Sequence, residues 1–201
     1  SAAASAASPA ETLVTGKPAR FVRIELPGDK RILTLAEVEV ISGGKNIAKN
    51  GTATQSSTNG DGKAPRALDG NKDPDWNKGG QTHTSNSGST NPWWEVDLKA
   101  PAEIEKVSIW NRSGFENRLA GFTITLLDAD RKEVFKAANV AAPQAMEIDV
   151  KNGGKLTYLA YDGKPGSPMK GGPALVGGAA GDSKPSNEPP LADVPTDYRD
   201  P

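Results

Sequence analysis

Short segments of alternating apolar and polar residues, each ended by a turn signal, recur along the chain and limit its fold more than any other feature. In the first of them, Val22, Ile24 and Leu26 alternate with larger or charged residues and stop at Pro27. Further strand-like segments cover residues 36–40, 46–56, 93–98, 104–111, 122–126, 132–135, 146–150 and 156–161. No segment has a convincing helical period. Many short strands at turn-marked intervals predict an all-β fold, an antiparallel β-sandwich or jelly roll.

Composition argues against several classes of partner and chemistry. The 201 residues include 24 Lys and Arg against 25 Asp and Glu, so net charge gives no reason to expect nucleic acid or an anionic membrane as a partner. Cysteine is absent, which removes disulfides, thiolate nucleophiles and cysteine-ligated metals. No apolar run approaches the roughly 20 residues of a membrane-spanning helix. We therefore expect neither a nucleic-acid partner nor a membrane span.

The two ends of the chain differ in composition from the middle. Residues 1–18 are rich in Ala, Ser and Pro and are expected to form a flexible leader, which is either the remnant of signal-peptide cleavage or a leader of another origin. Residues 162–201 are rich in Pro and Gly, beyond the level at which a packed core is expected. This tail is either disordered or extended on a partner surface that orders it. The sandwich is therefore assigned to residues 19–161.

A long polar loop, residues 60–90, interrupts the run of strands. Loops of this length inside a compact domain are usually functional or disordered. The loop contains Asp69-Gly70-Asn71 and the only histidine, His83. Closely spaced carboxylate, amide and carbonyl oxygens around a glycine turn are the ligands that a hard cation such as calcium needs. The alternative is a simple turn, in which the Asp and Asn side chains bond to their own backbone.

Four motifs, taken together, resemble one known family. Residues 67–73 (ALDGNKD), His83-Thr84, residues 91–98 (NPWWEVDL) and Asn111-Arg112 are similar in order and spacing to the F-type lectins, or fucolectins. That family is a branch of the discoidin, or coagulation factor 5/8 type C, superfamily. The resemblance is specific because separate motifs occur together. It implies a discoidin-like jelly roll of the kind found in modular exported bacterial proteins.

The order of the strands is rearranged relative to that family. Residues 20–28 and 33–40 resemble the last strand pair of the fold, yet they precede residues 46–57, which resemble its first strand. A circular permutation explains this order, since the termini of a sandwich often lie close together. The alternative is that residues 19–42 complete the sandwich of a neighbouring copy in an oligomer.

The resemblance also implies a structural calcium ion that holds the long loop. By motif position, Asp69 and Asn71 contribute side-chain or backbone oxygens and Glu37 contributes its carboxylate. The remaining ligands are the backbone carbonyls of Ala36, Arg66 and Gly80. Two carboxylates completed by carbonyl oxygens satisfy calcium, and modules of this kind bind it with a dissociation constant of roughly 10⁻⁴–10⁻³ M.

Fucose binding in the family uses one histidine and two arginines beside an apolar surface. The matching residues are His83, Arg112 and Arg118, with Phe115 or Trp76 as the apolar platform. The arginine fork suits neighbouring hydroxyls, and histidine supplies a third direction. The family usually places two cysteines in this loop as a wall for the sugar. They are absent here, so Phe115 would replace them.

Each of these residues also has a purely structural interpretation. His83 would then hydrogen-bond the loop in which it lies. The two arginines would form surface ion pairs with Glu116 or Asp128. Both interpretations stay open at the level of sequence.

Enzyme signatures are missing from the sequence. There is one histidine, no thiol, no G-x-S-x-G elbow and no phosphate-binding glycine loop. Asp73 and Asp75 can imitate the carboxylate pair of a glycosidase, but such a pair needs a set separation across a cleft. We therefore predict that the protein is not an enzyme.

We predict a calcium-stabilised carbohydrate-binding module whose ligand is a glycan. The more specific hypothesis is that this glycan is fucosylated. It is expected to act after export, in the periplasm, at the cell surface or outside the cell. The alternative is a structural assembly subunit whose residues 162–201 dock on a protein partner or form a homo-oligomer. The two are compatible, since a sandwich can assemble through its termini and bind sugar at its loops.

Overall fold

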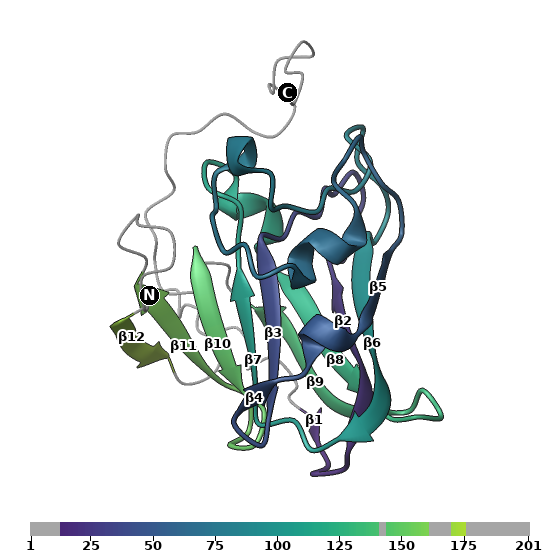
Figure 1. The fold of residues 1–201 in the computed structure, drawn as a ribbon, viewed down its shortest axis with the longest axis vertical. Helices are drawn as coiled ribbons and strands as arrows, with labels where there is room; N and C mark the ends of the chain where they lie inside the picture. Colours follow the sequence, from purple (N-terminus) through teal and green to yellow (C-terminus); the bar gives the residue numbers. More distant parts are fainter. Residues whose placement is uncertain (1–12, 141–143, 161–169, 176–201) are drawn as a thin grey trace, which may run out of the picture.

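Two antiparallel sheets packed face to face make up the described part of the chain. The computed structural model describes residues 13–140, 144–160 and 170–175. Each sheet has six strands. The long connections over residues 56–92 and 111–121 gather at one end of the sandwich, the upper end in Figure 1, which we call the loop end. The expected all-β sandwich is confirmed.

The first sheet has the strand order β1-β9-β8-β2-β6-β5, and the second has the order β12-β11-β10-β7-β3-β4. The strands of the first sheet are β1 (Leu13–Val14), β2 (Ala19–Glu25), β5 (Thr52–Gln55), β6 (Trp93–Ala102), β8 (Phe122–Leu127) and β9 (Glu133–Val140). Those of the second are β3 (Glu37–Ser42), β4 (Lys45–Asn46), β7 (Lys106–Trp110), β10 (Ala145–Asp149), β11 (Lys155–Ala160) and β12 (Lys170–Leu175). The short 3₁₀ helices are η1 (Ala48–Asn50), η2 (Ala64–Leu68), η3 (Trp76–Lys78) and η4 (Glu116–Leu119).

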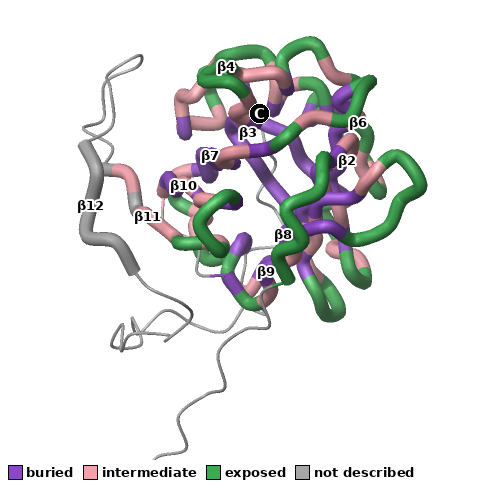
Figure 2. Tube along the Cα trace, turned by 90° about the horizontal axis from the view of Figure 1, so that it is seen from below, coloured by how far each residue is buried: buried purple, intermediate pink, exposed green. Residues whose placement is uncertain are grey.

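The alternating pattern of the strands places one face of each in the core. In β2 the side chains of Val22 and Ile24 are fully buried, whereas Arg23 between them is only half-buried. In β6 Trp94 is fully buried, and its Nε1 donates to the carbonyl oxygen of Ala64 at 2.9 Å. Figure 2 shows the buried residues between the two layers and the exposed ones on the outer connections. Burying one large apolar side chain contributes about 1.5–3 kcal/mol, so the loop end rests on a stable platform.

The N-terminal strand pair is completed within the same chain. β2 lies between β6 and β8, where Ile24 is opposite Trp94 on one side and Ile124 on the other. β3 pairs with β7, with Val38 opposite Ile109. One sandwich therefore accommodates the permuted order, and no neighbouring copy is needed to complete it.

The polar segment 46–56, expected to be a weak extended segment interrupted by Gly51, is divided into β4, η1 and β5. The division has a steric cause at Gly51, which follows η1. A Cβ at Gly51 would lie 2.5 Å from Cγ2 of Val96 and 2.8 Å from the carbonyl oxygen of Asp97. The chain passes so close to β6 at this point that only glycine fits.

The expected leader and tail each contribute a strand. Leu13 and Val14, which the sequence places in the leader, pair with β9, and Leu13 lies opposite Lys136. Residues 170–175, which the sequence places in the tail, form β12 and pair with β11. The remainder of both predictions falls on residues 1–12, 161–169 and 176–201, which lie outside the described residues.

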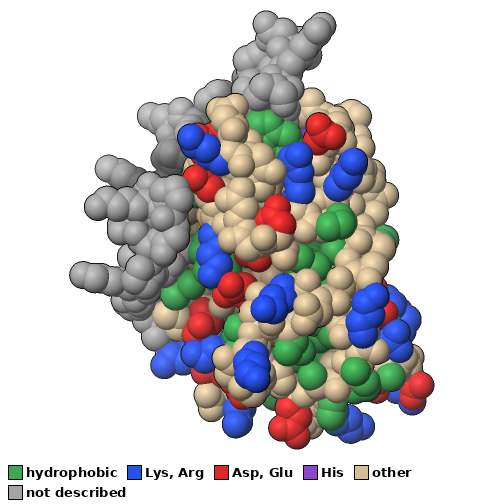
Figure 3. Space-filling view, viewed as in Figure 1, with side chains coloured by type: hydrophobic (Ala, Val, Ile, Leu, Met, Phe, Trp, Pro, Cys, Tyr) green, Lys and Arg blue, Asp and Glu red, His purple; other side chains and the backbone are tan. Residues whose placement is uncertain are grey.

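Charges of both signs are interspersed over the face of the molecule in Figure 3, between smaller apolar areas. Among the residues that the structure describes, no helix has the length and apolar character needed to cross a membrane.

Candidate functional site

His83 lies in a segment that crosses the loop end below the surface. The backbone N–H groups of its two neighbours, Thr82 and Thr84, donate to the carbonyls of Leu35 at 2.9 Å and Leu33 at 3.1 Å. The threonine hydroxyls accept in return from the N–H groups of Leu35 at 3.0 Å and Leu33 at 2.9 Å. These paired bonds hold the backbone on both sides of His83, so its position is set by the connection between β2 and β3.

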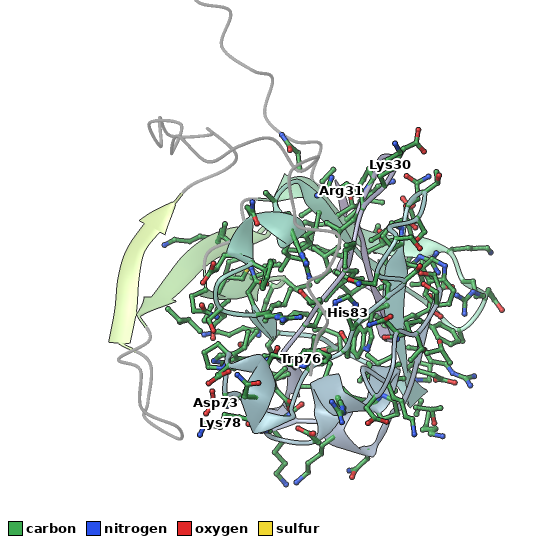
Figure 4. The ribbon with its side chains drawn as sticks, turned by 90° about the horizontal axis from the view of Figure 1, so that it is seen from above. Lys30, Arg31, Asp73, Trp76, Lys78 and His83 are labelled. Carbon is green, nitrogen blue, oxygen red and sulfur yellow. The ribbon has the colours of Figure 1, made fainter. Side chains whose placement is uncertain are left out.

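The imidazole of His83 is fully buried and has a defined tautomer. Nδ1 lies 2.6 Å from the carbonyl oxygen of Thr84, which can only accept, so Nδ1 carries the proton. Nε2 is then the acceptor, and it faces Nη1 of Arg118 at 3.4 Å. The ring of Trp76 packs edge-on against His83 with the centroids 5.5 Å apart. Figure 4 labels both residues. His83 therefore hydrogen-bonds its own loop, as the structural interpretation expects, and also contacts Arg118, a candidate sugar-binding residue.

Guanidinium groups and aromatic rings alternate next to this histidine. Cζ of Arg112 lies 4.5 Å from the ring centroid of Trp76 and 4.6 Å from that of Phe115. Cζ of Arg118 lies 4.0 Å from the centroid of Phe115. The geometry is that of cation–π contacts, which form within about 6 Å. The two rings predicted as an apolar platform thus also orient the arginines.

The interpretation of Arg112 and Arg118 as members of surface ion pairs is wrong, because both side chains are buried, with 1% and 7% of their surface exposed. The acidic groups considered as partners make other bonds. Oε1 of Glu116 accepts from the N–H of Gly114 at 3.0 Å. Oδ1 of Asp128 accepts backbone N–H groups in its own turn.

The loop that carries both arginines is anchored at the end of β7. Asn111 makes several of the anchoring hydrogen bonds. Its side-chain Oδ1 accepts from the N–H of Arg112 at 2.9 Å, and its Nδ2 donates to the carbonyl of Glu116 at 3.0 Å. Its backbone N–H donates to the carbonyl of Gln144 at 2.8 Å. The N–H of Ser113 donates to the carbonyl of Pro74 at 2.9 Å, which ties this loop to the segment before Trp76.

The residues predicted to bind calcium converge on a second cluster at the start of β3. Glu37 is buried, and its Oε1 accepts from the N–H of Gly70 at 3.2 Å. Oε2 of Glu37 has no hydrogen-bond partner among the described residues. Ala36 precedes Glu37 and donates its N–H to the carbonyl of Trp110 at 2.8 Å. A buried carboxylate oxygen without a partner is costly and points to a missing ligand.

The loop side of this cluster contains the predicted turn. Oδ1 of Asp69 accepts from the N–H of Asn71 at 2.8 Å, which is the Asx-type bond of the turn alternative. Asn71 in turn donates through Nδ2 to the carbonyl of Lys78 at 3.1 Å. Gly80 lies directly against Asn71, because a Cβ there would be 2.6 Å from Nδ2. Arg66 lies on η2, just before Asp69.

The carboxylates at this cluster influence one another electrostatically. Burial, together with the nearby carboxylate of Asp69, raises the pKa of Glu37 from its ordinary 4.5 to about 8. The Gly70 hydrogen bond and Lys72 lower it only in part. Among the described residues, no three His, Cys, Asp or Glu side chains gather at one point, so a cation here needs carbonyl oxygens as well.

Known proteins similar in sequence and structure are lectins or sugar-binding modules. Residues 66–160 match the F5/F8 type C family described as a NedA-like, galactose-binding domain. Fucolectin of Anguilla anguilla is 41% identical over 73 residues, which are 34% of this chain and 45% of that protein. The lectin domain of Lectinolysin, solved with Lewis B antigen, is 34% identical with a TM-score of 0.50, over 54% of this chain and 78% of that one. The Streptococcus pneumoniae fucose binding module SpX-3 is 37% identical with a TM-score of 0.50, over 53% of this chain and 78% of that one.

The chain belongs to the F-type lectin family. This confirms the resemblance drawn from the four motifs, and it places the chain in the discoidin-like superfamily. The chain spans about half the length of the eel fucolectin, so the kinship concerns one F-type lectin domain and not the whole of that protein.

One residue that supports the candidate site was not identified from the sequence. Arg31, in the connection between β2 and β3, donates through its guanidinium to the loop that carries Arg118. Arg31 supports the loop through backbone carbonyls that are far away in the sequence, and a sequence motif cannot indicate such contacts. Figure 4 labels Arg31 and His83 in a view onto the loop end of the sandwich.

Proposed function

We propose that this F-type lectin domain binds carbohydrate without catalysis and that its ligand carries a terminal fucose-type sugar. The observation that carries the proposal is the 3.4 Å contact between Arg118 and His83, inside a cluster where two guanidinium groups alternate with two aromatic rings. Two similar proteins support fucose as the sugar, since one is titled a fucose binding module and another was solved with Lewis B antigen.

The cluster has the chemistry that sugar hydroxyls require. A ring against the guanidinium plane fixes the direction of the N–H groups at its edge, and a planar fork of donors suits neighbouring hydroxyl oxygens. In a neutral ring that carries its proton on Nδ1, Nε2 of His83 is an acceptor. A hydroxyl both donates and accepts, so one sugar can donate to His83 and accept from Arg112 and Arg118 through neighbouring oxygens.

A structural calcium ion is part of the proposal. The residues present fit the ion: the partnerless Oε2 of Glu37 and the proximity of Asp69 both favour a positive charge at this point. Glu37 and Asp69 would supply carboxylate oxygens, and Asn71 an amide or carbonyl oxygen. The backbone carbonyls of Ala36, Arg66 and Gly80 would complete the ligand set. The bound ion would neutralise the carboxylates and fasten the loop before His83 to β3.

We also propose that the domain acts outside the cytoplasm. A site with two carboxylates and several carbonyls belongs to the weak class, with a dissociation constant of roughly 10⁻⁴–10⁻³ M that suits extracellular calcium. An assembly role for residues 162–201 stays a separate prediction. The described part of that segment, β12, pairs with β11 of the same chain.

The test is a glycan array read with and without calcium, on the wild-type domain and on Arg112→Ala. The matched control is Arg131→Ala, since that arginine also stacks on an aromatic ring, 4.4 Å from the centroid of Phe21, but away from His83. Calcium-dependent binding of fucosylated glycans by wild type and Arg131→Ala, lost in Arg112→Ala, is the expected result. No signal from folded wild type on any glycan would contradict the proposal.

A further inference from the structure

Three Asn-Gly pairs occur in the chain, at residues 50–51, 59–60 and 152–153. Such a pair is prone to spontaneous deamidation, because glycine has no Cβ to shield its backbone nitrogen, and this nitrogen can attack the side-chain carbon of the preceding asparagine. The reaction needs an asparagine side chain and a glycine N–H that are not held by hydrogen bonds, and room for the backbone to rotate. The fold meets these conditions unequally at the three pairs.

Two of the pairs are held against the reaction. The N–H of Gly51 donates to the carbonyl oxygen of Ala48 at 2.8 Å, and a Cβ at Gly51 would lie 2.5 Å from Cγ2 of Val96, so this backbone has no room to rotate. In the third pair, Nδ2 of Asn152 donates to Oδ2 of Asp149 at 2.8 Å, and the backbone N–H of Asn152 donates to Oδ1 at 3.0 Å. The side chain of Asn152 must therefore leave this carboxylate before it can react.

The pair Asn59-Gly60 has no such restraint at the reacting atoms. Among the described residues, neither the side chain of Asn59 nor the N–H of Gly60 has a hydrogen-bond partner. A Cβ built on Gly60 would meet nothing within 4 Å. Asn59 also lines a hollow of about 530 Å³ together with Asp61 and Trp76, so water reaches its side chain and ammonia can leave.

We infer that Asn59 is a site of spontaneous modification in the folded domain. The backbone nitrogen of Gly60 gives its proton to hydroxide and forms a bond to Cγ of Asn59. The bond from Cγ to Nδ2 breaks, and Nδ2 takes up a proton from water and leaves as ammonia. Water then opens the resulting five-membered succinimide at either of its carbonyls. One opening gives aspartate, and the other gives isoaspartate, in which the main chain runs through the side chain and is one methylene longer.

Isoaspartate at residue 59 displaces the histidine of the proposed sugar site, a consequence that rests on the proposed function. The N–H of Asn59 donates to the carbonyl of His83 at 2.9 Å, and the N–H of His83 donates to the carbonyl of Gly62 at 2.8 Å. Nε2 of Gln55 donates to the carbonyls of Gly62 at 2.9 Å and His83 at 3.2 Å. An extra methylene between residues 59 and 62 breaks one of these bonds or moves His83, so the modified domain loses affinity for the sugar.

The test follows the three pairs by peptide mapping with mass spectrometry while the domain is incubated at pH 8, either folded or in guanidinium chloride. In the folded domain we expect Asn59 to deamidate about tenfold faster than Asn50 or Asn152, a ratio that corresponds to about one hydrogen bond that these two pairs must first break. In guanidinium chloride the three rates should become equal, because the restraints are lost. The inference would be overturned if Asn59 reacted no faster than the other two in the folded domain, or if its lead persisted in the unfolded chain.

Calorimetric titration with L-fucose in calcium, before and after the incubation, tests the consequence for the sugar site. Asn59→Gln keeps an amide but needs a six-membered ring to react, so it should resist modification, whereas the matched control Asn152→Gln leaves Asn59 free to react. We expect the fraction of binding-competent wild type and Asn152→Gln to fall as isoaspartate accumulates, while Asn59→Gln retains its binding.

Unchanged binding by incubated wild type that contains isoaspartate at residue 59 would overturn the effect on the sugar site. Absence of binding by fresh, folded wild type would instead remove the proposed function, and the faster deamidation of Asn59 would still stand as a separate result.

Discussion

Arg31 holds the backbone of the loop that carries Arg118. Its Nη2 donates to the carbonyl oxygen of Arg118 at 3.0 Å and to that of Ala120 at 2.7 Å, while Nη1 donates to the carbonyl of Pro27 at 3.0 Å. The Arg31 guanidinium is partly removed from water, and this burial lowers its pKa. The connection between β2 and β3 therefore fixes one of the two arginines proposed to bind the sugar.

Arg31→Ala is expected to weaken fucose binding about tenfold, because two donated hydrogen bonds of roughly 1 kcal/mol each no longer hold the Arg118 loop. Arg31→Lys keeps the charge but not the fork and is expected to recover only part of the affinity. Calorimetric titration with L-fucose measures both. Arg23→Ala, on the outer face of β2, is the control. Wild-type affinity in a folded Arg31→Ala protein would show that the loop keeps its shape without this residue.

Glu37 makes the stability of the calcium-free domain depend on pH. The folded protein holds a proton on Glu37 up to its pKa of about 8, whereas the unfolded chain releases it near the ordinary pKa of 4.5. Unfolding therefore releases a proton between these values, and the free energy of unfolding falls as pH rises through that window. The slope from this group is at most about 1.4 kcal/mol per pH unit. Urea unfolding in EDTA from pH 5 to pH 8 measures it, and Glu37→Gln should remove this contribution.

Calcium should reverse this trend, because it binds the deprotonated carboxylate. At 100 times its dissociation constant, a ligand that binds only the folded state stabilises it by about 2.7 kcal/mol. We expect the melting temperature of wild type to rise with calcium near pH 8, and that of Glu37→Gln to stay unchanged. Glu105→Gln is the control on a remote, half-buried carboxylate. A melt of wild type that calcium leaves unmoved would count against the ion.

Gly62→Ala should displace His83 without replacing any residue proposed to bind the sugar. The new Cβ would meet Cβ of His83 at 2.4 Å, and forcing extra volume into a packed site costs about 1–3 kcal/mol. We expect a lower melting temperature together with weaker fucose binding, whereas exposed Lys63→Ala should change neither. Unaltered binding by Gly62→Ala would mean that the position of His83 does not matter for the ligand.

The sequence was sufficient to predict the sandwich because its strands bury one face. The alternation of Val22 and Ile24 with Arg23 indicates which face of β2 is buried. The motif around Trp94 indicates β6, the strand that pairs with β2. The interruption at Gly51 was also predictable, but its steric reason, the close approach of β6, was not. The local sequence pattern does not indicate contacts between segments that are distant in the chain.

Site residues were predictable to the extent that they lie in motifs. His83, Arg112 and Arg118 were identified through the resemblance to the F-type lectins, and the structure brings them together with Phe115. The alternation of rings and guanidinium groups was not predicted, because it depends on how η3 and η4 face each other. Arg31 was missed for the same reason, since its partners are carbonyls that any residue can provide.

The most direct test of the central claim follows the side-chain N–H signals of Arg112 and Arg118 and the ring signals of His83 by NMR during titration with L-fucose in calcium. Binding at the cluster predicts saturable shifts of all three residues with one dissociation constant, and smaller changes at Arg131. Unmoved signals from these three residues at saturating fucose, in a protein with the dispersed spectrum of a folded domain, would contradict the assignment of this cluster as the sugar site.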